Sequence, residues 1–160
     1  MYTTRNDISQ HLRSKLADLL NARLADALDL EAASKQAHWN VKGPNFIALH
    51  ELFDKVHESI EDHVDTLAER ITALGGIARG TVQASARATS LVPYPEDLAE
   101  GRAHLRALSD RLAEFGKKSR AAIAESDDLG DADTADLFTG ISRDLDKKLW
   151  LLEAHLQGQG

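Results

Sequence analysis

The sequence predicts an all-α fold: four long helices in a bundle, with one long crossover that carries a short helix between the second and third. Apolar residues recur at steps of three and four residues over four long segments, which is typical of helices with one buried face. Aromatic residues make up only 5% of the chain, so a core must be built mostly from Leu, Ala and Ile. The 160 residues suffice for a single domain, 1–160, with a substantial core.

Two long helices are expected in the first half of the chain. After a short N-terminal tail, residues 1–6, the apolar pattern predicts a helix over about 7–39. Gly43-Pro44 interrupts the pattern, since Gly suits a helix C-terminal turn and Pro suits a first helical position. A second apolar stripe predicts a helix over about 44–74, which Gly75-Gly76 ends.

The second half begins with the crossover, residues 77–95. So long a connection without structure would be unusual, and residues 81–90 can form a short helix with a threonine as N-cap. A third long helix is expected over about 96–126 and a fourth over about 133–156. Residues 157–160 form a short C-terminal tail.

Composition excludes several kinds of function. The chain has no cysteine, which excludes disulfides, thiolate zinc sites and iron–sulfur clusters. No apolar run is long enough to span a membrane and no signal-peptide pattern is visible, so a cytoplasmic protein is expected. The net charge of −7 disfavours binding to DNA and favours attraction of cations.

The side chains that could bind a metal ion are concentrated between residues 35 and 76. This stretch contains four of the seven histidines: His38, His50, His57 and His63. His50 and Asp54 are four residues apart, so on a helix they point the same way from adjacent turns. Asp65 and Glu69 have the same spacing. Imidazole and carboxylate ligands suit iron, manganese or zinc. The alternative, from spacing alone, is a set of surface ion pairs.

The distance between the two pairs is informative. Asp54 and Asp65 are eleven residues apart, about three turns, so they share a face but lie roughly 16 Å apart along the axis. One metal site cannot span that distance. Either the pairs are two separate half-sites, or each is completed by another copy of the helix. In an antiparallel pair of helices related by a two-fold axis between Ser59 and Ile60, the first pair of one copy faces the second pair of the other, giving two identical sites about 22 Å apart.

These residues resemble the signature of the Dps family, the mini-ferritins named as DNA-binding proteins from starved cells. The similarity extends over nearly the whole chain and is carried by His38-Trp39, Leu49-His50 with Phe53-Asp54, Asp65 with Ala68-Glu69-Arg70, and Ser142-Arg143-Asp144-Leu145-Asp146-Lys147 with Leu149-Trp150. Four long helices with one long crossover also match the topology of ferritin-like bundles. No Glu precedes a His by three residues, which disfavours a di-iron site inside each monomer.

The resemblance implies a ferroxidase centre shared across a two-fold dimer interface. Its catalytic and metal-binding residues would be His38, His50, Asp54, Asp65 and Glu69, the first three from one subunit and the last two from its partner. It further implies oxidation of ferrous iron by hydrogen peroxide or oxygen, with peroxide favoured, storage of ferric mineral in a dodecameric shell, and protection against oxidative stress. An acidic turn would line the three-fold pores by which iron enters, through Asp127, Asp128, Asp131 and Asp133.

Two alternatives remain at this stage. One is a DNA-compacting stress protein with little redox activity, although the basic tail that some family members use is nearly absent here. The other is a structural helical oligomer.

The remaining aromatic and histidine side chains have simpler interpretations. We expect His57 and His63 to have interface roles, as a residue beside the metal site and as a hydrogen-bonding residue respectively. Trp39 is interpreted as an interface or core aromatic, and in the family its counterpart lies near the iron centre, where it can intercept oxidising equivalents. The other histidines are expected at the surface: His11, His104 and His155.

Overall fold

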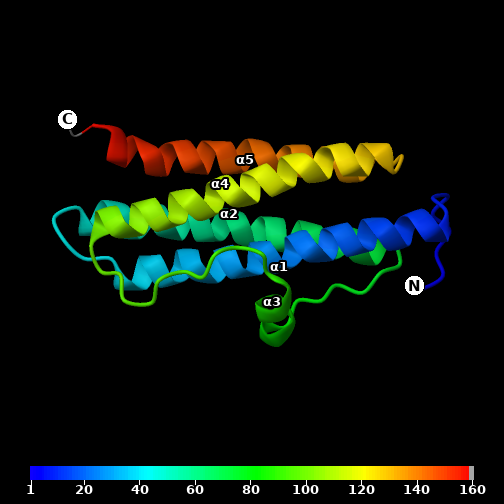
Figure 1. Cartoon of the computed structure of the whole chain (residues 1–160), viewed down its shortest axis with the longest axis horizontal. Helices are drawn as coiled ribbons and strands as arrows, with labels where there is room; N and C mark the ends of the chain where they lie inside the picture. The colour runs from blue at the N-terminus through cyan, green and yellow to red at the C-terminus, as the bar shows by residue number, and fades with distance from the viewer. Residues whose placement is uncertain (159–160) are drawn as a thin grey trace.

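The computed structural model describes residues 1–158, and within them it contains five helices and no strand. In chain order these are α1 (Gln10–Asn40), α2 (Phe46–Ala73), α3 (Val82–Ala88), α4 (Gly101–Asp128) and α5 (Ala132–Gln157). Four are long and lie side by side as a bundle, while α3 is a short helix in the crossover (Figure 1). The predicted fold class and the place of the short helix are confirmed.

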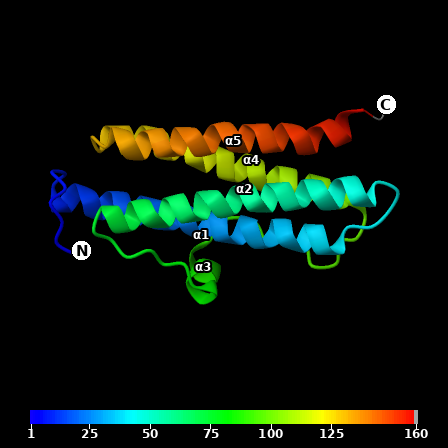
Figure 2. The ribbon, with the colours of Figure 1, turned by 180° about the vertical axis from the view of Figure 1, so that it is seen from behind.

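The bundle consists of two helical hairpins. α1 packs along α2, and α4 packs along α5, while the crossover runs over the outer side of α1 and carries α3 with it (Figures 1 and 2). The core is mostly Leu, Ile, Val and Ala, as expected, with three fully buried phenylalanines: Phe53, Phe115 and Phe138. Within the described part of the chain, no helix is both long and apolar enough to cross a membrane.

Two helix boundaries differ from those predicted. α1 begins at Gln10 rather than near residue 7, because the Ser9 hydroxyl accepts a hydrogen bond from the Leu12 amide and so caps the helix. α4 begins at Gly101 rather than near residue 96. Residues 96 and 97 form a turn and Glu100 is extended, since the Lys42 amide donates to the Ala99 carbonyl at 2.8 Å and holds this segment against the α1–α2 turn.

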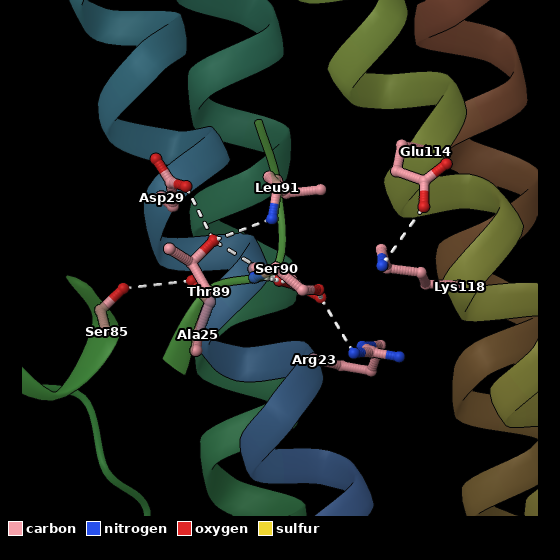
Figure 3. Close-up of polar contacts among 10 residues, drawn as sticks. Arg23, Ala25, Asp29, Ser85, Thr89, Ser90, Leu91, Glu114 and Lys118 are labelled. Atoms are coloured by element: carbon pink, nitrogen blue, oxygen red, sulfur yellow. Dashed lines mark hydrogen bonds and ion pairs between the residues drawn. The ribbon is translucent and has the colours of Figure 1, made fainter. Parts of the chain in front are cut away.

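The crossover is fixed to α1 by a buried carboxylate. Asp26 is fully buried and accepts hydrogen bonds from the amide of Ser90 at 2.7 Å and from its hydroxyl at 2.9 Å. Arg23, one turn earlier on α1, balances its charge with an ion pair of 3.0 Å. The residue before Ser90, Thr89, donates to Asp29 at 2.7 Å (Figure 3). A long loop is thereby held in one position along the bundle.

Candidate metal centre

His38 and His50 hold each other across the α1–α2 hairpin. The Nδ1 atom of His38 lies 2.8 Å from the His50 carbonyl oxygen, and the Nδ1 of His50 lies 2.8 Å from the His38 carbonyl oxygen. The two rings are stacked, with centroids 3.6 Å apart. Because a carbonyl oxygen only accepts, each Nδ1 must carry the proton it donates. In the neutral rings both Nε2 atoms therefore keep a free lone pair, which is the form that binds metals.

Asp54 lies beside this pair and is held as an anion. Its Oδ1 atom is 2.5 Å from the Lys35 ammonium and 3.8 Å from His38 Nδ1. The hydrogen bond from Lys35 lowers the pKa of the Asp54 carboxyl below its ordinary value. Asp54 is one turn from His50 on α2, and its side chain is 33% exposed. The structure thus brings three of the five predicted ligands close together, and the ammonium group of Lys35 is paired with the Asp54 carboxylate.

Asp65 and Glu69 are not part of this cluster. Both are exposed on α2, which is an uninterrupted helix from Phe46 to Ala73, so the separation of roughly 16 Å from Asp54 to Asp65 holds. Across residues 1–158, no three His, Cys, Asp or Glu side chains are arranged so that they could hold a metal ion together. A single chain therefore presents two separate groups of candidate ligands, one shared by α1 and α2 and the other on α2 alone.

Comparison with known proteins identifies the family. The model of the ferritin-like domain matches residues 17–158. A DNA protection during starvation protein from Agrobacterium fabrum is 48% identical over 156 residues, which cover 98% of this chain and 96% of that protein. One from Mycolicibacterium smegmatis is 35% identical, over 96% of this chain and 83% of that protein. The chain belongs to the Dps family.

Solved structures of Dps proteins agree with this assignment. The tetragonal form of Mycobacterium smegmatis Dps superposes with a TM-score of 0.94 at 34% identity, over 100% of this chain and 96% of that one. The Dps protein of Vibrio cholerae O1 superposes with a TM-score of 0.91 at 26% identity, over 98% of each chain. The latter is described as a member of a broad superfamily of ferritin-like diiron-carboxylate proteins.

Two further histidines of α2 form hydrogen bonds within the chain. His57 Nδ1 lies 3.3 Å from the Glu31 carbonyl oxygen on α1. His63 Nε2 lies 3.0 Å from a carboxylate oxygen of Asp144 on α5, which also accepts from the Ser59 hydroxyl. Burial acts to raise the pKa of Asp144, but these two bonds and the Lys148 ammonium outweigh it and lower that pKa. His63 is thus a hydrogen-bonding residue, as expected, within its own bundle, while its place at an interface stays a prediction.

The other aromatic and histidine side chains divide into exposed and buried. Trp39 is 69% exposed, which excludes a place in the core of the single chain and leaves the interface interpretation. His11 and His155 are exposed, as predicted. The prediction for His104 was wrong, because this residue is only 1% exposed and its Nδ1 forms a hydrogen bond with the Tyr94 hydroxyl. Its spacing of four residues from Leu108, which is fully buried on α4, is the signal that pointed inward.

The acidic turn is shorter than predicted, and its carboxylates are not equivalent. Asp127 and Asp128 belong to the last turn of α4 and are exposed, as is Asp133 in the first turn of α5. Asp131 is only 3% exposed. It caps α5 and accepts two hydrogen bonds of 2.8 Å from the Arg70 guanidinium on α2. Asp131 is therefore a structural residue of this Dps subunit, and only the other three carboxylates are free to face a pore.

Proposed function

We propose that this protein is an iron-storing ferroxidase whose sites are shared between two subunits. The observation that carries the proposal is the pair of complementary half-sites, one formed by α1 and α2 together and the other by α2 alone. The Nε2 lone pairs of His38 and His50, with anionic Asp54, form one half, and the exposed carboxylates of Asp65 and Glu69 form the other. Neither half forms a site alone, because no three His, Cys, Asp or Glu side chains of residues 1–158 are placed to hold one metal ion together.

A two-fold axis completes both halves together. If α2 packs antiparallel against α2 of a second subunit near Ser59 and Ile60, each first half faces the partner's second half. This arrangement gives two identical sites per dimer, about 22 Å apart along the straight helices. Six such dimers would form the dodecameric shell, with the mineral inside it.

The chemistry suits ferrous iron as substrate. Two ferrous ions each give one electron to hydrogen peroxide, its O–O bond breaks, and two hydroxide ions form beside two ferric ions, which then enter the mineral. Oxygen and nitrogen ligands survive this oxidant, whereas thiolates are oxidised by it, and the chain contains no cysteine. By consuming both ferrous iron and peroxide, the protein would protect the cell against oxidative damage.

The word "DNA" in the names of the relatives is compatible with this activity without DNA binding. Removal of iron and peroxide protects DNA chemically, and the charge of −7 opposes contact with phosphates. We expect no retardation of plasmid DNA by the iron-free protein in a gel-shift assay at about 150 mM salt. Retardation under these conditions would favour the DNA-compacting alternative.

A subunit-mixing experiment tests whether the sites are shared. Asp54→Ala and Glu69→Ala each remove one ligand from every site, so both variants should oxidise iron slowly. After the two variants are unfolded, mixed equally and refolded together, half of the dimers combine one of each. In such a dimer one site carries both substitutions, and the other has all its ligands. About a quarter of all sites should therefore be whole, and oxidation should rise toward that fraction of the wild-type rate.

Asp110→Ala is the control variant, because it removes an exposed carboxylate of α4 and should leave iron oxidation unchanged. Mixed assembly is verified by native mass spectrometry of differently tagged variants. If the co-refolded sample then oxidises iron no faster than the average of its two parents, the ligands do not come from two subunits and the shared site is wrong.

A further inference from the structure

The half-buried Tyr94 and the buried His104 form a hydrogen-bonded pair that the proposed metal centre does not use. Tyr94 lies near the end of the crossover, and His104 lies in the first turn of α4. The Tyr94 hydroxyl is 2.6 Å from Nδ1 of His104. His104 is 1% exposed, and in the tautomer of its neutral ring that carries the proton on Nε2, Nδ1 accepts from the phenol. The Nε2 atom itself has no hydrogen-bond partner among the described residues.

The pair lies between the metal-binding side of the bundle and its outer surface. The ring of Phe53, which is fully buried on α2 and directly precedes Asp54, has its centroid 6.0 Å from that of His104. The rings of His104 and Tyr94 are nearly parallel, with centroids 6.1 Å apart. On the other side, Tyr94 lines a groove of about 450 Å³ between α1 and the crossover. Three rings therefore extend from behind Asp54 to the molecular surface.

The environment keeps both members neutral at rest. Burial raises the pKa of the Tyr94 hydroxyl and lowers the pKa of the His104 imidazole, although contact with the Leu98 backbone partly offsets the latter. The phenolic proton consequently stays on Tyr94 until an electron is removed. A phenol that has lost an electron is a strong acid, and an unprotonated nitrogen at 2.6 Å is placed to receive its proton.

We propose that Tyr94 and His104 act as a redox pair that captures single oxidising equivalents escaping from iron oxidation. The source of the oxidant rests on the proposed ferroxidase function. When one ferrous ion alone reduces peroxide, the products are a ferric ion, hydroxide and a hydroxyl radical. Tyr94 gives one electron to that radical, which becomes hydroxide, and the phenolic proton moves to Nδ1 of His104. The result is a neutral tyrosyl radical beside an imidazolium.

A second ferrous ion returns the pair to its resting state. The ion gives one electron to the Tyr94 radical and becomes ferric, while the proton passes back from His104 to the phenolate oxygen. The low pKa that burial gives His104 favours this return. The sum of both steps is the oxidation of one ferrous ion by one hydroxyl radical, giving a ferric ion and hydroxide. The hydroxyl radical thus oxidises ferrous iron and does not damage the protein.

The chain allows a clear spectroscopic test because it contains only two tyrosines, Tyr2 and Tyr94. Tyr2 has an exposed side chain near the N-terminus. Samples loaded with ferrous iron are mixed with peroxide, freeze-quenched, and examined by electron paramagnetic resonance. We expect a tyrosyl signal in the wild type that persists in Tyr2→Phe and disappears in Tyr94→Phe. In Tyr2→Phe any tyrosyl signal must come from Tyr94, so this variant decides the matter even if Tyr94→Phe fails to assemble.

His104→Gln tests the partner's role as proton acceptor. With the imidazole lost, we expect at least a tenfold smaller tyrosyl signal while the shell elutes normally in size-exclusion chromatography. An unchanged signal in this variant would remove His104 from the mechanism. A tyrosyl signal that survives in Tyr94→Phe, or none in wild-type samples that form ferric iron normally, would overturn the proposal and leave the ferroxidase function standing.

An iron-free experiment keeps the two proposals distinguishable. A photogenerated ruthenium(III) polypyridyl complex removes one electron from the apoprotein without iron or peroxide. Tyr2→Phe should then show the Tyr94 radical, with a longer lifetime than in the double variant Tyr2→Phe/His104→Gln. Equal lifetimes would contradict the redox pair. Failure of iron oxidation together with a long-lived Tyr94 radical here would instead reject the ferroxidase function alone.

Discussion

At the scale of single residues, main-chain carbonyls determine how the two imidazoles of the metal centre are presented. The carbonyl groups of His38 and His50 lie near the adjoining ends of α1 and α2, where each accepts a hydrogen bond from the opposite ring. The proton on each Nδ1 is thereby fixed, and both Nε2 atoms are available without any rearrangement of side chains. Binding then needs little ordering of ligands, which favours high affinity for a divalent cation.

The ammonium group of Lys35 forms an ion pair with the Asp54 carboxylate, the same group that would bind a metal ion. An incoming cation must displace the ammonium group at 2.5 Å and overcome its charge. Lys35→Met, which removes the charge and keeps the length, should strengthen binding of cobalt(II), a stand-in for ferrous iron, about fivefold, since an exposed ion pair is worth about 1 kcal/mol. Isothermal titration calorimetry of the assembled protein measures the affinity.

Lys55→Met is the matched control, because Lys55 is exposed, follows Asp54 directly, and carries the same charge. It should change the affinity less than twofold. Equal or weaker binding of cobalt by Lys35→Met would mean that Lys35 helps to build the site and does not compete for Asp54.

The candidate ligands could be proposed from the sequence, and their role as ligands stays a prediction, but the protein groups that contact them could not be foreseen. His50 and Asp54 share one face because of a four-residue spacing that is visible in the sequence. Lys35 is nineteen residues from Asp54, on another helix, and only the packing of α1 against α2 brings the two together. Burial of His104 had a local signal in its spacing from Leu108, yet its partner Tyr94 depends on the path of the crossover.

At the scale of elements, α2 carries all the candidate ligands except His38, and it also contacts the hairpin formed by α4 and α5. Arg70, the residue after Glu69, donates to Asp131 at the start of α5 and to the Thr134 hydroxyl at 2.9 Å. Burial acts to raise the pKa of Asp131, but the hydrogen bonds from Thr134 and Arg70 outweigh it, so the pKa is lowered. The end of α2 that presents Glu69 is therefore fixed by a charged contact with the α4–α5 turn.

Asp131→Asn should destabilise the fold by about 3 kcal/mol at neutral pH, because it removes one partner of a buried ion pair. A carboxyl whose folded pKa lies below its ordinary value of 3.8 stabilises the protein above that pH, and the stabilisation is lost as the pH falls through the folded pKa. The difference in stability between wild type and variant should therefore shrink below about pH 4. Urea unfolding at several pH values measures it.

Asp133→Asn provides the comparison for this prediction. Its carboxylate is 4.0 Å from the same guanidinium but 86% exposed, so its loss should change stability by less than about 1 kcal/mol. If the two variants were equally stable at neutral pH, the contact of Arg70 with Asp131 would not anchor α2 to the α4–α5 turn.

The periodic apolar residues predicted the helices correctly, but they did not predict where α1 and α4 begin. The proline and acidic residues near 96 are typical of a helix start, which is why α4 was expected there. The main-chain contact of Lys42 with Ala99 keeps that segment out of the helix, and Gly101 begins the helix where a side chain would collide with Leu49. Tertiary contacts overrode the local preference at this end.

At the scale of the whole molecule, the exposed carboxylates determine how the protein would meet its substrate. The chain has a net charge of −7, and the assembled shell would multiply it. A field of this sign attracts ferrous ions and repels phosphates. Both the fold and the family were predictable from the sequence. That Asp131 is a buried structural carboxylate, unlike the exposed carboxylates of the same turn, could be seen only from the position of Arg70 in the structure.

The exposed part of that turn should accelerate iron entry and leave the oxidation step unchanged. We predict that replacing Asp127, Asp128 and Asp133 by Asn slows iron uptake several-fold at low ionic strength, with Asp131 kept because it supports α5. The difference should narrow at about 0.5 M salt, where the screening length is shorter than 5 Å and steering by surface charge is weak.

Stopped-flow absorbance of ferric iron measures the uptake rate, and cobalt titration shows whether the proposed ferroxidase sites bind metal as in the wild type. Asp110→Asn, on the exposed side of α4, serves as control for the loss of charge. If the triple variant takes up iron at the wild-type rate in low salt, the turn does not line the entry route. If it is equally slow at every salt concentration, the turn acts by shape or assembly, since an electrostatic effect must weaken as ions screen it.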